Sequence, residues 1–354
     1  MANETMTGVV PVEGAASPAR EISSAVFHWA TGTRGTGQGR VLFGETREHL
    51  HELTRLSARG DAVLTPAAAE PGAEDLSSGA RLLTYQGALT EPGDLMHIGR
   101  GYEIEMQDYL SLPFLPITRP MVVRCLSERS WDAFIADADE ARSTGRFIPQ
   151  LAGSSVALAD RAVIEATVDR SPVAVTGLTV DRDGEARYGA AAPSVGSVAD
   201  LHALATELDA LTFLDGVGGR RIEGRLAERG WLRAYLTALR VVGREGGETW
   251  RISGFGGTLT GEDPAPDALR TDNLVIWRDD EHQFVVGGSG RRFALGRDTA
   301  IVVEILLASS SLDAARSAIV AAGLDRVGLD QDIADLLRRF ADRGVTISPG
   351  AVTA

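Results

Sequence analysis

The chain has 354 residues, a formal net charge of −14 and a single cysteine, Cys125. This length allows two or three domains with cores of their own, and the acidic balance argues against nucleic acid and anionic membrane surfaces as partners. All 35 basic residues are arginines, which excludes a Schiff-base lysine and a Walker lysine. One cysteine excludes an internal disulfide, and the apolar run around it predicts a buried strand.

Residues 1–22 are rich in Ala, Gly, Pro and Glu, and we expect a disordered arm there. They lack the basic start and apolar centre of a signal peptide. No later run approaches the roughly 18 apolar residues that a membrane span needs. The sequence therefore predicts a cytoplasmic protein.

Residues 23–66 predict a small β-β-α-β segment. Its expected strand, flexible loop, strand, helix and strand fall at 25–30, 31–39, 40–44, 46–57 and 62–64. The loop is rich in glycine, but a phosphate-binding turn requires a helix directly after the glycines. An apolar strand follows here, so we interpret the loop as a hairpin connection.

Residues 67–80 predict a linker, and residues 81–263 an α/β middle domain in which strands and helices alternate. The expected strands of this domain lie at 120–126, 173–180 and 249–253. The expected helices are one capped by Ser127 and two more at 198–211 and 225–242. Residues 264–272, with two prolines, predict a second linker.

Catalytic patterns are sparse in this chain. None of the six histidines lies in a metalloprotease-type spacing. His97 has Asp94 and Arg100 nearby in sequence, which would suit acid–base work, although a hydrogen-bonded loop histidine is the commoner situation. Glu103 and Glu105 would share one strand face as solvated charges. We expect neither a metal site nor a cofactor.

Residues 273–348 contain the clearest pattern, followed by a short tail at 349–354. Three apolar runs separated by turn residues predict a small antiparallel sheet. Three helices should follow, with Asp298, Ser311 and Asp330 as their N-caps. Three strands followed by three helices form a winged-helix arrangement.

A DNA-binding winged helix needs cationic side chains on its last helix, because phosphate neutralisation supplies most of the affinity. Here that helix begins with Asp330, Asp332 and Asp335, which carry the wrong sign. The sequence therefore argues against DNA as the partner.

The order and spacing of this region resemble another winged-helix family, the PqqD-like recognition elements of ribosomally synthesised, modified peptides. The resemblance is carried by 293–300 (FALGRDTA), 305–312 (ILLASSSL) and 332–337 (DIADLL) with Gly344 after the last helix. It covers about a fifth of the chain. It implies binding of a precursor's leader peptide, which would pair as an extra strand with the third strand of the module.

The resemblance also implies a set of peptide-binding residues on the third strand and the last helix. They are Arg291, Arg292, Phe293, Ala294, Leu295, Asp332, Leu336 and Arg339. Phe293 and Leu295 should pack on the helices while Arg292 and Ala294 face the other way. Arg292 and Arg339 would either be solvated or hold acidic leader residues.

The layout of the whole chain resembles the recognition proteins of daptide pathways. This resemblance implies an accessory, non-catalytic role beside an oxidoreductase that oxidatively decarboxylates the C-terminal Thr of the precursor, with an aminotransferase as a further partner. Two alternatives stay open at this point. One is an enzyme with its active site in residues 81–263, and the other is an acidic winged-helix adaptor without a peptide substrate.

Overall fold

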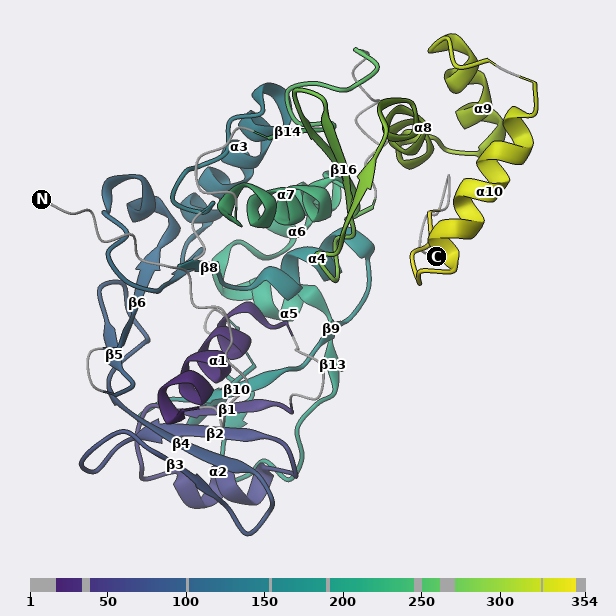
Figure 1. Cartoon of the computed structure of the whole chain (residues 1–354). Helices are drawn as coiled ribbons and strands as arrows, with labels where there is room; N and C mark the ends of the chain where they lie inside the picture. Colours follow the sequence, from purple (N-terminus) through teal and green to yellow (C-terminus); the bar gives the residue numbers. More distant parts are fainter. Residues whose placement is uncertain are drawn as a thin grey trace, which may run out of the picture.

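The computed structural model describes residues 17–33, 39–99, 102–152, 155–188, 192–244, 250–261, 271–325 and 327–347. Within these ranges the chain is a mixed α/β protein with a large sheet, several helices and a smaller C-terminal sheet (Figure 1). None of the described helices is both long enough and apolar enough to cross a membrane.

The large sheet joins the N-terminal and middle regions. Its strands are β1 (Val41–Gly44), β2 (Ala62–Pro66), β3 (Ala73–Asp75), β4 (Arg81–Gly87), β5 (Leu95–His97), β6 (Glu103–Asp108), β7 (Met121–Arg124), β8 (Val156–Leu158), β10 (Gly177–Val180), β11 (Glu185–Arg187) and β12 (Gly196–Ser197). Their order is β12-β11-β10-β1-β2-β4-β5-β6-β7-β8, with β3 beside β4. The four strands β10, β1, β2 and β4 run parallel, as do β6, β7 and β8, and β5 is antiparallel to both of its neighbours.

This continuous sheet corrects the expected division at 67–80. Residues 73–75 form β3, which pairs with β4, and β2 pairs directly with β4 across the expected linker. Residues 23–66 and the first part of 81–263 therefore share one sheet. The Ala/Glu/Pro composition of 67–80 indicated a linker because a short edge strand needs little apolar sequence.

Two helices cover opposite faces of the parallel strands, namely α1 (Pro18–Thr31) and α2 (Leu50–Leu56) (Figure 1). The predicted strand at 25–30 was wrong, because this stretch lies inside α1. Ile22, Ala25, Val26 and Ala30 are buried at helical spacing in one apolar cluster with β1 and β4. The predicted arm at 1–22 was also too long, since Pro18 begins the helix, and residues 1–16 lie outside the described ranges.

A second group of helices packs around Tyr235 and Trp131 in the middle region. It consists of α3 (Glu128–Thr144), α4 (Arg161–Asp169), α5 (Ala210–Leu214), α6 (Gly219–Ala227) and α7 (Leu232–Arg244), with the 3-10 turns η1 (Tyr109–Phe114) and η2 (Asp215–Val217). The prediction that Ser127 caps α3 is confirmed, because its side chain accepts a hydrogen bond from the Ser130 backbone N–H. The predicted helix at 225–242 is two helices interrupted near Gly230.

The helix predicted at 198–211 was wrong. The backbone carbonyls of Val198, Ala199 and Leu201 accept hydrogen bonds from the Arg55 guanidinium, so they are satisfied without a helix. Further along, β13 (Glu207–Leu208) pairs with β9 (Val173–Ala174) as a separate two-stranded sheet. The predicted strand at 173–180 is correspondingly split into β9 and β10.

The C-terminal sheet has the order β14-β15-β16-β17. Its strands are β14 (Arg251–Ile252), β15 (Leu274–Arg278), β16 (Glu281–Val285) and β17 (Arg292–Leu295), followed by α8 (Arg297–Ala308), α9 (Leu312–Ala321) and α10 (Leu329–Ala341). The three predicted strands and three predicted helices are present. The predicted three-stranded sheet gains a fourth strand, β14, from the region assigned to the middle domain.

Of the three helix caps predicted for the C-terminal region, one is confirmed. Ser311 accepts a hydrogen bond from the Ala314 backbone N–H and caps α9. Asp298 lies inside the first turn of α8, whose N-cap is Gly296, and Asp330 lies inside α10, whose N-cap is Gly328 at φ +88°. Acidic residues suit a first helical turn as well as a cap position, so sequence alone did not separate the two.

The C-terminal sheet is shared between two layers (Figure 1). Val275 and Phe284 point into the cluster formed with α8–α10. Leu274, Ile276 and Val285 point the other way, into the cluster that contains α7. Residues 273–347 are therefore packed into the rest of the protein through one whole face of their sheet. Of the predicted linker 264–272, only Thr271 and Asp272 lie in the described ranges, and the tail 349–354 lies outside them.

Candidate functional site

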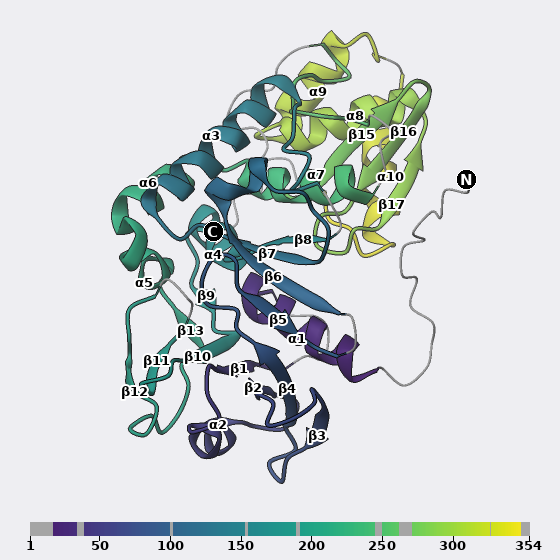
Figure 2. The same cartoon turned by 90° about the vertical axis from the view of Figure 1, so that its left-hand side faces the viewer.

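β17 is the outermost strand of the C-terminal sheet within the described residues (Figure 2). It pairs with β16 in antiparallel register, with Phe284 opposite Phe293 and Gln283 opposite Ala294. The Val286 N–H donates to the Arg291 carbonyl at 2.9 Å. Because hydrogen-bonded and non-bonded pairs alternate along an antiparallel ladder, Phe293 bonds toward β16. The N–H and C=O groups of Arg292 and Ala294 then point outward from the edge.

The side chains of β17 divide between the two faces as the alternation predicts. Phe293 lies 6.3 Å from Phe284 and 5.7 Å from Phe340, ring centre to ring centre, and it packs with Leu295 on the helices. Arg292 lines a small cavity with Thr237 and Val241 of α7 on the opposite face. Ala294 is exposed. The prediction for the two faces is confirmed, and Arg292 is directed toward α7.

Arg291 lies just before β17 and is exposed. Its guanidinium stands 5.8 Å from the centre of the Phe293 ring and donates to the Gly344 carbonyl at 3.4 Å. A cation over an aromatic face is weakly attracted to it. Arg291 therefore joins the start of β17 to the segment that follows α10.

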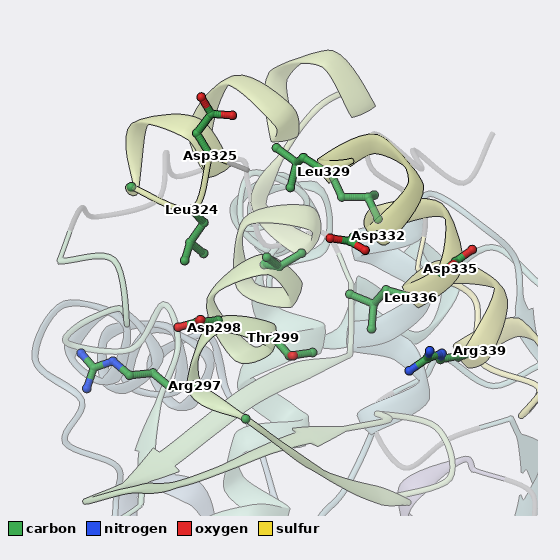
Figure 3. A pocket seen from close by; sticks show the side chains of 14 residues that line it. Arg297, Asp298, Thr299, Leu324, Asp325, Leu329, Asp332, Asp335, Leu336 and Arg339 are labelled. Atoms are coloured by element: carbon green, nitrogen blue, oxygen red, sulfur yellow. The ribbon is translucent and has the colours of Figure 1, made fainter. Parts of the chain in front are cut away.

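A groove of about 670 Å³ begins where β17 ends, between α8 and α10. Its walls come from the start of α8, the turn after α9 and one face of α10: Gly296, Arg297, Asp298, Thr299, Val302, Gly323, Leu324, Asp325, Leu329, Asp332, Ile333, Asp335, Leu336 and Arg339. Asp332, Leu336 and Arg339 extend from α10 toward α8, whereas Asp335 points away (Figure 3). This volume falls within the range of ligand-binding clefts.

Four aspartates and two arginines line this groove, so its lining is acidic. Asp335 is engaged by Arg338 and by the Gln331 amide, 2.7 Å away. Arg297 extends away from α10 (Figure 3). Asp332, near the start of α10, and Arg339, near its end, are the charged side chains of this helix that extend into the groove (Figure 3).

The α8 wall is held in place by a buried carboxylate. Glu304 is 5% exposed and accepts hydrogen bonds from the Ser253 hydroxyl at 2.5 Å, the Leu259 N–H at 2.9 Å and the Thr260 N–H at 3.1 Å. Hydrogen bonds to a charged acceptor are about twice as strong as neutral ones. Glu304 thereby ties α8 to the segment that follows β14.

The structure brings the predicted residues together in two adjoining places. Asp332, Leu336 and Arg339 line the groove, while Arg291–Leu295 form the sheet edge that leads into it through Gly296. The opposite wall, with Asp298 and Leu324, was missed. The available signal was the immediate passage from strand to helix at Gly296, which places the first turn of α8 beside the strand end.

The features considered for an enzyme lie elsewhere. His97 belongs to β5, its side chain is 43% exposed, and its Nδ1 lies 3.1 Å from Glu103. Glu103 and Glu105 both face Arg119. Cys125 is buried, as predicted, and burial raises the pKa of its thiol well above the usual range.

Three carboxyls outside the C-terminal sheet have a raised pKa, chiefly because burial disfavours the charged form. They are Glu45, where Asp181 adds to the effect, Asp137, which accepts from the Tyr109 hydroxyl, and Asp169, which faces Arg233. None of the three lines the groove. Within the described ranges, no group of three or more His, Cys, Asp and Glu side chains is arranged to hold a metal ion.

The fold and site thus define a mixed α/β protein with a C-terminal sheet edge that opens into a groove between helices. No family model, curated protein or solved structure matches the chain.

Proposed function

We propose that this chain recognises the leader segment of a ribosomally made precursor peptide, through a C-terminal module of the winged-helix, PqqD-like type. The observation that carries the proposal is the outer edge of β17, where the backbone N–H and C=O of Ala294 are directed outward beside the groove. An extended peptide can pair with such an edge and insert side chains into a neighbouring groove.

The surroundings of this edge support capture of a peptide in one fixed position. Phe293, Phe284 and Phe340 pack against one another beneath the strand, and Glu304 holds the α8 wall. A site that is already ordered loses less entropy when the ligand binds. A short peptide can therefore bind without first reorganising the protein.

We propose further that the protein acts in a daptide-type pathway as a non-catalytic partner. It presents the precursor to an oxidoreductase that oxidatively decarboxylates the C-terminal Thr, with an aminotransferase acting beside it. Holding the leader raises the effective concentration of the other end of the peptide at the partner's active site. The cytoplasm is the compartment in which such a precursor is made.

The test is fluorescence anisotropy with the full chain. The probe is a labelled leader from the precursor encoded by a small reading frame next to the gene. Ala294→Pro removes an outward-facing donor and is compatible with an edge strand. We expect a Kd in the micromolar range or tighter for the wild type, and about tenfold weaker binding for the variant.

Ala294→Val is the matched control, because valine keeps the N–H and suits an exposed strand position. It should bind the leader like the wild type. Circular dichroism must show both variants to be folded. If the folded wild type fails to bind, or if Ala294→Pro binds as tightly as Ala294→Val, leader capture at β17 is refuted.

A further inference from the structure

β8 is the outermost strand of the large sheet within the described residues, and one of its sides is open. The Ala159 N–H, directly after the strand, donates to the Val123 carbonyl of β7 at 2.7 Å. Alternate residues of a strand bond toward the same side. Ala157 therefore also bonds toward β7, and the backbone N–H and C=O groups of Val156 and Leu158 point outward.

These outward groups have no hydrogen-bond partner among the described residues. The next outward N–H along the chain, that of Asp160, donates to the Ala30 carbonyl of α1 at 2.9 Å. The helix thus closes the edge only beyond the end of the strand. All three residues of β8 are partly exposed, whereas β7 is buried at every position. The open edge is confined to Val156–Leu158.

This edge lacks the features that often keep edge strands from pairing with another chain, namely charged side chains, prolines and bulges. Residues 155–159 read SVALA, with no charged residue and no proline. The register with β7 is regular, without a bulge. β8 can therefore accept a further strand along its whole length.

A cavity of about 340 Å³ lies beside the open edge. β8 lies between α7 and α1 (Figures 1 and 2), and the cavity extends from the strand toward α7. Apolar side chains that leave water for such a cavity gain free energy in proportion to the area they bury. The largest apolar side chains of its lining are Leu151, Val156, Leu158, Leu236 and Leu239.

Two arginines line the same cavity, and both already have partners. Nε of Arg161 lies 2.7 Å from the carboxylate of Glu165. The guanidinium of Arg240 donates to the Gly287 carbonyl at 2.5 Å. The cavity therefore favours an apolar occupant over an anionic one.

A second copy of β8 matches this edge both in its backbone and in its side chains. With a two-fold axis through Ala157, Val156 lies opposite Leu158 of the second copy, and the two outward-facing residues exchange both of their hydrogen bonds. Val156 and Leu158 pack on the face of the sheet that carries α7. Residues directly opposite each other share a face, so the second copy would direct the same apolar side chains toward the cavity.

The charges nearest to the strand do not oppose this pairing. Asp160 follows β8 and lies three residues from the axis. The two copies of Asp160 would then be about 20 Å apart along the strands. This distance exceeds the Debye length of about 8 Å at physiological ionic strength, so their repulsion is largely screened.

We propose that two copies of this chain associate edge to edge through β8, in antiparallel register, to form a two-fold dimer whose large sheet continues across the interface. Each copy contributes Val156 and Leu158 to the cavity of the other. Two-fold interfaces require a surface that is complementary to itself, and this edge meets that requirement. The interface does not include β17, so it can be tested independently of leader recognition.

Sedimentation velocity of the full chain, from about 1 to 200 µM, tests the association. We expect the sedimentation coefficient to rise with concentration, with a dimer Kd in the micromolar range. Val156→Pro removes one outward donor from each copy at the first residue of an edge strand, where proline is tolerated. It should weaken the dimer at least about tenfold. Val156→Ile keeps the N–H and suits a strand, so it should dimerise like the wild type.

Cysteine cross-linking tests the register. Ala157→Cys places two thiols at the axis, with Cα atoms about 4.5 Å apart, which a disulfide can bridge. Ser155→Cys is the matched control, because this exposed position lies on the same face but about 14 Å from its copy. Under oxidation by copper phenanthroline, Ala157→Cys should give a covalent dimer on a non-reducing gel. Ser155→Cys and the wild type, whose Cys125 is buried, should remain monomeric on the same gel.

A chain that sediments as a monomer over the whole range refutes the proposal. A dimer that is as stable in folded Val156→Pro as in Val156→Ile also refutes it, as does equal cross-linking of Ala157→Cys and Ser155→Cys. If circular dichroism shows Val156→Pro to be unfolded, the cross-linking pair decides. A confirmed dimer that binds no leader would overturn the proposed function and leave the interface in place.

Discussion

Replacing Glu304 by glutamine tests whether the buried carboxylate holds the C-terminal helices to the rest of the protein. Glutamine has nearly the same shape, but one of its two terminal groups is a donor. In the structure Oε1 of Glu304 accepts from Ser253 and Leu259, and Oε2 accepts from the Thr260 N–H. With the amide oxygen in place of Oε1, the Thr260 N–H would face an NH₂ group and lose its acceptor.

The cost follows from these three bonds. A buried donor left without a partner costs about 1–3 kcal/mol, and the two remaining bonds weaken because the acceptor is no longer charged. Removing the charge also removes the cost of burying it, which offsets part of the loss. We expect Glu304→Gln to lower the free energy of unfolding by about 2 kcal/mol, and Tm by about 3 °C for a chain of this length.

Urea unfolding of the full chain, followed by tryptophan fluorescence, measures this change, because Trp250 and Trp277 lie in or next to the same sheet. Glu281→Gln is the control. Glu281 pairs with Arg278 on the surface, so its replacement should leave the urea midpoint almost unchanged. If Glu304→Gln is as stable as this control, the carboxylate does not hold α8 as argued.

Three further predictions concern the middle region. Gly243→Ala should destabilise the protein by about 1–3 kcal/mol, because the added Cβ would lie 1.8 Å from the Ala152 carbonyl oxygen. Gly224→Ala on α6 places its Cβ in open space and should stabilise the protein by about 0.5–1 kcal/mol. Comparing the two thermal melts tests this, and equal shifts would contradict it. Cys125 should react with iodoacetamide at pH 8 roughly a hundredfold faster in the guanidinium-unfolded protein than in the native one, because its thiol is buried. Mass spectrometry of the alkylated chain measures both rates, and fast labelling of the native protein would show that the thiol is accessible. Asp137 has a raised pKa in the folded state, so its ionised form lowers stability above that pKa. Asp137→Asn should therefore raise the free energy of unfolding at pH 7 by less than about 1 kcal/mol. Urea unfolding at several pH values should show this difference from the wild type shrinking toward about pH 4. A difference that grows on acidification would mean that the pKa of Asp137 is lowered, not raised, in the folded state.

The sequence predicted the C-terminal elements well because their signals are local. The apolar spacing of α10 and the Ser311 cap depend on neighbouring residues only. The stretch that became α1 was misassigned for the opposite reason. Val26, Phe27 and Trp29 favour strands by intrinsic preference, and the helix forms because Ile22 and Val26 can be buried together against a distant sheet.

Half of the groove could be predicted, and half could not. The α10 side followed from helical periodicity, which places Asp332, Leu336 and Arg339 on one stripe. The α8 side depends on how α8 is positioned relative to α10, and Glu304 contributes to this through partners about 45 to 51 residues earlier in the chain. Nothing in a local pattern marks a buried glutamate as the partner of a remote loop.

The sharing of one small sheet between two apolar clusters bears on how this region could be transplanted. A fragment of residues 273–347 would expose Leu274, Ile276 and Val285 to solvent, because these side chains lie on the face of the sheet that α7 covers. It would also lack β14, leaving β15 as a second open edge and a ready site for self-association. A fusion that joins this region to a different protein would therefore need to begin upstream of α7, so that it includes both the covering helix and the fourth strand.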